Sequence, residues 1–136
     1  MKVLSPFGPK IAIIKMPKNI IKKINLEVDK ILNDKKRLKK SDYSNNLVGQ
    51  VKQEIQLSPK FIEKNLLNFI GINVKKYIKK SINKNAKKIS LKNLWVVRQF
   101  KNEYNPIHFH SGNISGVGYL KIPKNITKRK KRLKTN

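Results

Sequence analysis

The stretch that decides the fold is ISLKNLWVVRQFKNEYNPIHFHSGNISGVGYLKIP, residues 89–123. Residues 89–100 are rich in β-branched and aromatic side chains and roughly alternate between apolar and polar, so they predict a strand. Residues 107–110 predict a second strand and residues 114–123 a third, with the turn SGN between them. The C-terminal part of the chain is therefore expected to form consecutive strands.

The sequence before this stretch has mainly helical patterning. Residues 10–15 predict a short strand, and an amphipathic helix is expected from Pro17 onward. Residues 47–51, LVGQV, are interpreted as a short strand or a packed turn. A long helix is predicted over 58–82, where Ser58 can act as the N-cap and Pro59 suits the first position. Helices followed by consecutive strands predict an α+β fold.

Composition narrows the class of protein. The 136 residues are enough for one domain or part of one, and 38% of them are hydrophobic, which predicts a small core. The absence of cysteine excludes disulfides, thiolate metal sites and a cysteine nucleophile. No run of 18 apolar residues exists, and the N-terminus does not read as a secretory signal. We therefore expect no membrane partner and a cytoplasmic location.

The formal charge of +26 points to a polyanion partner such as nucleic acid. A competing explanation is codon bias, because lysine, isoleucine and asparagine dominate the composition and AT-rich genomes favour all three. The tail KRKKRLK, residues 128–134, is typical of a nucleic-acid-binding tail, or it is a basic surface loop. A small basic nucleic-acid-binding protein is thus one possible function.

The only two histidines, His108 and His110, lie one residue apart in the predicted strand 107–110. Side chains at such positions share one face of a strand, with Cα atoms roughly 6–7 Å apart, so both rings can converge on one metal ion. Imidazole suits iron, zinc, copper and nickel. A further ligand must come from one of seven carboxylates, of which Glu103 is the nearest in sequence. The alternative is one buried, hydrogen-bonded histidine and one exposed histidine.

The block LWVVRQFKNEYNPIHFHSGNISGVGYLKIP, residues 94–123, resembles the core of iron(II)/2-oxoglutarate-dependent oxygenases of marine bacteria and their phages, relatives of the prolyl hydroxylases. The resemblance also covers the FGP element at 7–9 and the LVGQV segment at 47–51. It implies a double-stranded β-helix (jelly-roll, cupin-like) that holds one non-haem iron. It also implies hydroxylation of a C–H bond, coupled to the conversion of 2-oxoglutarate and dioxygen to succinate.

The resemblance implies that His108 is the first histidine of the family's HxD/E element, whereas His110 stands where that element has its carboxylate. Either both histidines bind the metal, which is the prediction made here, or one supports the site from outside and another group supplies the carboxylate. Tyr104, Asn105 and Tyr119 are expected to bind 2-oxoglutarate or a metal-bound water, although roles in turns and sheets fit them equally.

The family pattern also requires a distal histidine, followed by an arginine or lysine for 2-oxoglutarate, and neither follows the block. Residues 1–127 are therefore expected to be the N-terminal portion of an oxygenase domain with an incomplete β-helix, and residues 128–136 a truncated basic loop. Such a fragment is expected to be inactive alone. A non-catalytic remnant that serves as an interaction module is the remaining alternative.

Overall fold

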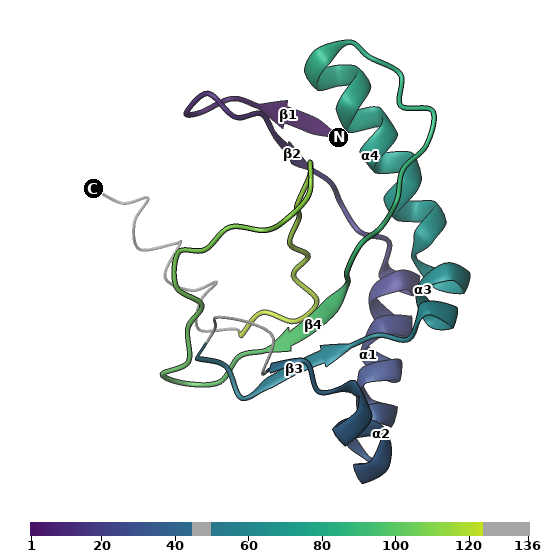
Figure 1. Ribbon diagram of the computed structural model, residues 1–136, viewed down its shortest axis with the longest axis vertical. Helices are drawn as coiled ribbons and strands as arrows, with labels where there is room; N and C mark the ends of the chain where they lie inside the picture. Colours follow the sequence, from purple (N-terminus) through teal and green to yellow (C-terminus); the bar gives the residue numbers. More distant parts are fainter. Residues whose placement is uncertain (45–49, 124–136) are drawn as a thin grey trace.

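Four helices and two small antiparallel sheets make up residues 1–44 and 50–123, the part of the chain that the structure describes. Figure 1 shows this computed structural model. The elements in chain order are β1 (Lys2–Leu4), β2 (Ile11–Ile13), α1 (Lys18–Leu32), α2 (Lys35–Ser41), β3 (Gln53–Gln56), α3 (Pro59–Asn65), α4 (Leu67–Ile82) and β4 (Trp95–Arg98). The predicted mixed α+β class is confirmed. No closed barrel forms among the described residues, so the expected double-stranded β-helix is not confirmed.

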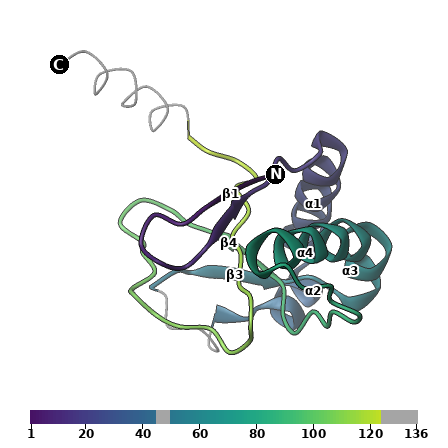
Figure 2. The same cartoon turned by 90° about the horizontal axis from the view of Figure 1, so that it is seen from above.

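The two sheets and the helices occupy different sides of the molecule. Figures 1 and 2 show the helices gathered along one side and the long segment after β4 running over the other. Strand β1 pairs with β2, and β3 pairs with β4, both antiparallel. Among the described residues, no helix is long and apolar enough to cross a membrane.

The predicted helix after Pro17 is confirmed as α1, and its apolar stripe faces the core. Its buried residues recur at helical spacing, and they are Ile20, Ile24, Val28 and Ile31. They pack with Ile55, Leu57 and Leu66 in one hydrophobic cluster. The short helix α2 follows because the side chain of Asp34 accepts the backbone N–H of Arg37 and caps its first turn.

The helix predicted over 58–82 is two helices, not one. Ser58 caps α3 through Phe61 N–H, with Pro59 in its first turn, as predicted. Leu66, at φ −125° and ψ −35°, departs from helical geometry and separates α3 from α4. Its side chain is 3% exposed, so the break lets Leu66 enter the core cluster. Helix α4 ends at Asn83, which adopts a left-handed conformation with φ 55°.

The sheet of β3 and β4 has two different faces. Ile55 pairs with Val96, and both pack in or against the core cluster under the helices. Glu54 pairs with Val97, and because strand side chains alternate, these two point to the opposite face. Trp95 shares that second face, since it lies two residues from Val97.

The prediction of two further strands after β4 is wrong. Only Trp95–Arg98 of the predicted strand 89–100 is a strand, and residues 107–110 and 114–123 are irregular. A strand exists only where a neighbour completes its hydrogen-bond ladder, and no strand pairs with either segment among the described residues. The side chains of Phe109 and Val117 are accordingly 95% and 80% exposed. The segment LVGQV and the basic tail 128–136 lie wholly or largely outside the described residues.

Candidate metal-binding site

The two histidines meet although they do not lie on a strand. The Nε2 atoms of His108 and His110 are 3.0 Å apart, and the rings stand nearly perpendicular at 83°, with centroids 4.6 Å apart. Both side chains are exposed. The irregular backbone of 107–110, not strand alternation, brings the two imidazoles together, and binding of a metal by them stays a prediction.

The position of the proton on His108 follows from its neighbour. The Nδ1 atom of His108 lies 2.7 Å from the carbonyl oxygen of Pro106. A carbonyl can only accept, so Nδ1 must carry the hydrogen and donate it. In the neutral ring, Nε2 then carries a lone pair, which accepts the hydrogen bond of 3.0 Å that the Nε2–H of His110 donates. A ring held through one nitrogen by a backbone carbonyl, with a lone pair on the other nitrogen, is the usual state of a metal-binding histidine.

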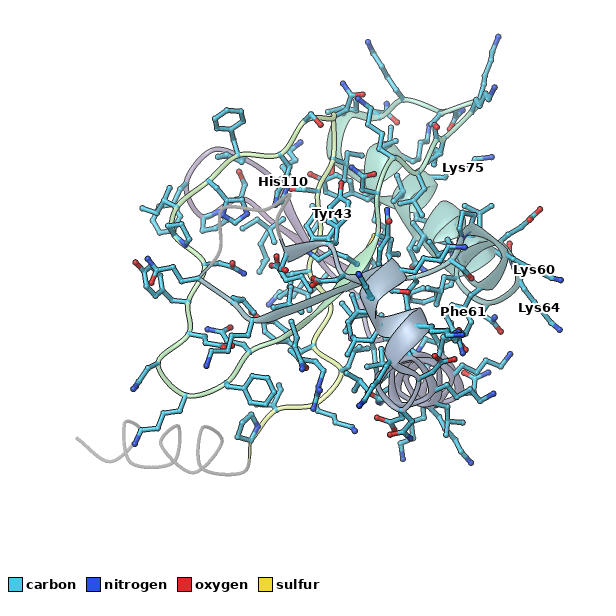
Figure 3. All side chains as sticks on the ribbon, turned by 60° about the horizontal axis from the view of Figure 1, so that its bottom comes forward. Tyr43, Lys60, Phe61, Lys64, Lys75 and His110 are labelled. Carbon is cyan, nitrogen blue, oxygen red and sulfur yellow. The ribbon has the colours of Figure 1, made fainter. Side chains whose placement is uncertain are left out.

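Aromatic rings connect the histidine pair to the sheet. The His110 ring lies against the indole of Trp95, with centroids 5.7 Å apart, and Trp95 in turn contacts Tyr43 at 6.0 Å. Figure 3 labels Tyr43 and His110, the two rings that contact Trp95. Trp95 is only half-buried, and it links β4 to the histidine pair.

A buried carboxylate lies on the same face of the sheet. Glu54 is 2% exposed, and its Oε2 has no hydrogen-bond partner. Burial raises the pKa of the Glu54 carboxyl, the nearby Asp42 raises it further, and the charge on His108 lowers it. Asp42 itself is held by Ser44, whose hydroxyl and N–H hydrogen bonds to the carboxylate lower the Asp42 pKa. Sequence reasoning missed Glu54 because it missed β3.

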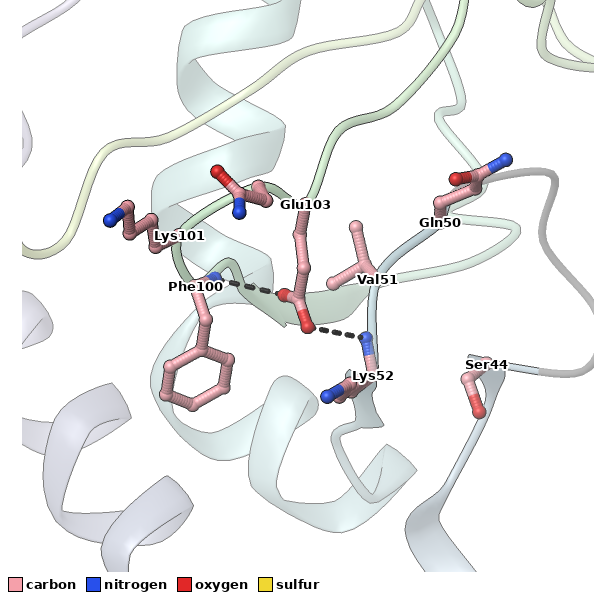
Figure 4. A pocket seen from close by; sticks show the side chains of 8 residues that line it. Ser44, Gln50, Val51, Lys52, Phe100, Lys101 and Glu103 are labelled. Atoms are coloured by element: carbon pink, nitrogen blue, oxygen red, sulfur yellow. Dashed lines mark hydrogen bonds between the residues drawn. The ribbon is translucent and has the colours of Figure 1, made fainter.

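Glu103, the carboxylate nearest to the histidines in sequence, has a structural role instead. Its two oxygens accept the backbone N–H of Phe100 at 2.8 Å and that of Lys52 at 3.3 Å. Figure 4 shows both bonds on the wall of an open depression, which Gln50, Val51 and Lys101 also help to line. These bonds tie the loop after β4 to the chain before β3. Both oxygens of the Glu103 carboxylate are therefore engaged by backbone N–H groups.

The residues expected to bind 2-oxoglutarate are exposed and dispersed. The carbonyl of Tyr104 accepts Gln50 N–H at 2.9 Å, a role of its backbone only, and its side chain is 51% exposed. Asn105 is exposed, and Tyr119 is 73% exposed on the irregular segment 114–123. Arg98, on β4, donates to Gln53 and stacks over Phe100, with its guanidinium carbon 5.3 Å from the ring centre.

Within residues 1–44 and 50–123, no group of three or more His, Cys, Asp or Glu side chains stands close enough to hold a metal ion. The donors present are therefore two converging imidazoles, with a carboxylate nearby. No protein-family model, curated protein or solved structure matches the chain.

Proposed function

We propose that this chain supplies the two histidine ligands of a non-haem iron(II)/2-oxoglutarate-dependent dioxygenase. The observation that carries the proposal is the 3.0 Å separation of the two Nε2 atoms. Two nitrogens bound to one ion at about 2.0–2.1 Å and at a right angle are about 2.9 Å apart. The pair is thus spaced for neighbouring positions of an octahedral ion, which is the arrangement of the iron in this class of oxygenase.

The donor chemistry also fits iron(II). The hydrogen bond from His108 Nδ1–H to Pro106 keeps the lone pair on Nε2, where an ion would replace the hydrogen bond from His110. The tilted contact of His110 with Trp95 limits how its ring can turn. When bound, the iron would supply the oxidation of 2-oxoglutarate to succinate coupled to C–H hydroxylation. The exposure of both rings leaves the solvent side of the ion open to a co-substrate.

The remaining residues have proposed roles in binding. Tyr104, Asn105 and Tyr119 are the proposed hydrogen-bond partners of 2-oxoglutarate, and their exposed polar groups are available to it. The formal charge of +26 favours the approach of a dianion. The chain's part in the chemistry is to hold the ion and to position this co-substrate.

The proposal is tested by metal binding and by turnover. Co²⁺, a spectroscopic substitute for iron(II), is titrated into the 136-residue chain and followed by its visible absorption. We expect one ion per chain and a weakening of at least about tenfold in His108→Ala and in His110→Ala, as for loss of metal-site partners. Phe109→Ala is the matched control, because Phe109 stands between the histidines and is 95% exposed.

Turnover is then measured as succinate formed from 2-oxoglutarate with iron(II) and oxygen, comparing the chain with its His108→Ala variant. Succinate that depends on His108 supports an oxygenase. Cobalt binding that survives both histidine substitutions contradicts the site. Binding through the histidines with no succinate shows a metal site that does not turn over 2-oxoglutarate in this chain by itself.

A further inference from the structure

We infer that the outer face of α4 binds the phosphate backbone of a nucleic-acid duplex without reading its base sequence. This face carries four exposed lysines, which we call the α4 stripe: Lys75, Lys76, Lys79 and Lys80. The inference goes beyond the proposed function, because the surface lies on a helix and involves neither histidine.

The α4 stripe follows from helical spacing. Residues three or four apart share one face of a helix, so the four lysines form two adjacent rows. The other face of α4 is used for packing. Phe69 and Ile70 lie against the core cluster, and Tyr77 donates a hydrogen bond to the carbonyl of Lys10 in the N-terminal hairpin. The lysine side chains are therefore left to the solvent.

The α4 stripe has no compensating negative charge among the described residues. The one ion pair between described residues joins α1 to α2. Lysines four residues apart repel each other and destabilise a helix. The helix dipole offsets this repulsion at Lys79 and Lys80, in the last turn, but its effect fades beyond that turn. A polyanion bound along the stripe would relieve the repulsion.

The surroundings of the stripe add positive charge and no negative charge. Residues 64–102 include eleven basic residues and no acidic one. The irregular loop 83–94 turns back beside α4 (Figures 1 and 2). The hairpin fastened to α4 also has lysines and no carboxylate. The loop contributes four of the eleven basic residues, all of them exposed: Lys84, Lys87, Lys88 and Lys92.

Helix α2 has the same lysine spacing in a different setting. KKRLKK at 35–40 places its lysines as KKYIKK does at 75–80. Residues 27–42, however, also include four of the seven carboxylates of the chain. Figure 1 shows α2 and the C-terminal half of α4 at opposite ends of the molecule. A codon bias toward lysine acts on both segments alike, but only the α4 stripe is left without carboxylates around it.

The chemistry of the stripe favours a duplex backbone over other polyanions. Lysine binds phosphate as a point charge, and arginine, whose planar fork suits bidentate recognition, is absent from α4. Single strands are usually bound by stacking on exposed aromatic rings, whereas Phe69 and Tyr77 of α4 are half-buried. A membrane-bound helix inserts its apolar face, and that of α4 packs on the core.

The test compares two variants that remove equal charge from the two helices. Fluorescence anisotropy of a labelled DNA duplex of about 20 base pairs measures affinity between about 50 and 200 mM salt. Both variants have four fewer positive charges than the +26 of the chain, and both keep the basic tail 128–134. Glutamine and lysine are similar helix formers, and urea unfolding verifies that both variants fold. The α4 variant carries Lys75→Gln, Lys76→Gln, Lys79→Gln and Lys80→Gln, and the α2 variant carries Lys35→Gln, Lys36→Gln, Lys39→Gln and Lys40→Gln.

The α4 variant should bind the duplex at least about tenfold more weakly at the lowest salt concentration. The slope of log K against log salt should become less negative by up to about 3.6, since each lost phosphate contact accounts for about 0.9. The α2 variant should lose less than about threefold, because its lysines make no such contacts. An RNA duplex of the same sequence identifies the preferred backbone, and selective loss on either duplex supports the inference.

Several results would overturn the inference. Equal weakening in the two variants would mean that only the net charge matters, and unchanged binding in both would mean that the α4 stripe makes no contact. Failure of the unmodified chain to bind either duplex, or tighter binding of a single strand of equal length, is equally contradictory. So is an α4 variant that loses binding to phosphatidylserine vesicles and keeps the duplex. Co²⁺ binding by the α4 variant should be unchanged, so the proposed function is tested independently.

Discussion

The phenol of Tyr77 donates a hydrogen bond of 2.6 Å to the carbonyl oxygen of Lys10, across 67 residues of chain. This bond joins α4 to the N-terminal hairpin of β1 and β2. The ammonium of Lys10 reinforces it by donating to the carbonyl of Ser81 at the end of the same helix. The hairpin is therefore fastened to α4 at the start of β2 (Figure 1).

Tyr77→Phe should loosen the hairpin without unfolding the rest. We expect a loss of about 0.5–1.5 kcal/mol, the usual net value of one hydrogen bond. Amide exchange should accelerate at β1 and β2 and stay unchanged at β3 and β4. Tyr119→Phe, at a 73% exposed position, is the control and should have no effect on exchange. Unchanged exchange of the hairpin in Tyr77→Phe would show that the bond does not hold it.

Ile55→Ala should be among the most destabilising single changes. Its side chain is 1% exposed and packs against α1 in the core cluster. Loss of these atoms and the cavity that remains should cost about 2–5 kcal/mol, a large part of the stability of a small domain. Urea denaturation measures the cost. Ile82→Ala, at a 61% exposed position, should cost less than about 1 kcal/mol, and equal costs would contradict the assigned core.

Glu54 should make stability fall as pH rises. Its folded-state pKa is raised above the ordinary value of 4.5 by burial and by Asp42, so the folded protein retains a proton that the unfolded chain releases. The free energy of unfolding therefore decreases as pH rises from about 4.5 through the raised pKa. In Glu54→Gln this decline should be absent, giving a higher free energy of unfolding at pH 7 without metal.

The measurement is urea denaturation between pH 4 and pH 8 in the presence of a chelator, on both proteins. Asp42 has the opposite effect on the pH dependence of stability. Because its pKa is lowered in the folded state, it stabilises that state at pH values above its unfolded-state pKa, and this contribution is lost as pH falls through the lowered pKa. Its hydrogen bonds to Ser44 are common to both proteins, so the difference between them reports the Glu54 carboxyl and its coupling to Asp42. A difference between the two proteins that does not change with pH would refute the assignment to Glu54.

Ser58→Ala should destabilise the start of α3. The Ser58 hydroxyl accepts Phe61 N–H at 3.3 Å, a long bond at an exposed helix end. We expect a cost near the lower end of the usual range of about 0.5–2 kcal/mol, read as a shift in the urea midpoint. Ser58→Asp retains an acceptor and should recover the loss. If Ser58→Asp is as unstable as Ser58→Ala, capping is not the cause.

Local signals in the sequence were sufficient to predict where the helices α1 and α3 begin and which face of α1 is buried. Ile20, Ile24, Val28 and Ile31 repeat at helical spacing, and they form the buried face of α1. Ser58 and Pro59 mark the start of α3 by their capping chemistry. The break at Leu66 was not predictable in the same way, because no proline or glycine stands there. It depends on the burial of Leu66 in the core, which is a tertiary effect.

The strands were harder to predict because pairing depends on distant residues. Strand β3 has a signal, since Val51, Ile55 and Leu57 are buried at a period of two, with Glu54 between them, but the polar residues around them hid it. The segments 107–110 and 114–123 have the composition of strands and lack neighbours to pair with among the described residues. A strand-forming composition does not by itself provide the neighbouring strand with which a segment must pair.

The candidate site was predicted in part. That His108 and His110 would converge followed from their spacing, though the backbone that brings them together was predicted wrongly. Glu103 was the nearest carboxylate in sequence, whereas the carboxylate coupled to His108 is Glu54, more than fifty residues upstream. That association exists only because β3 pairs with β4 and positions Glu54 on the face of Trp95.

The pairing of β3 with β4 also determines which side chains each face of the sheet presents. Ile55 and Glu54 are adjacent in the chain, yet one belongs to the apolar core and the other to the polar face beside the histidines. A slip of one residue would exchange them, because side chains alternate along a strand. A carboxylate would then enter the core and an isoleucine would face the imidazoles. Insertion of one residue before Gln53 should therefore abolish folding, and it should be more damaging than any single substitution in β3.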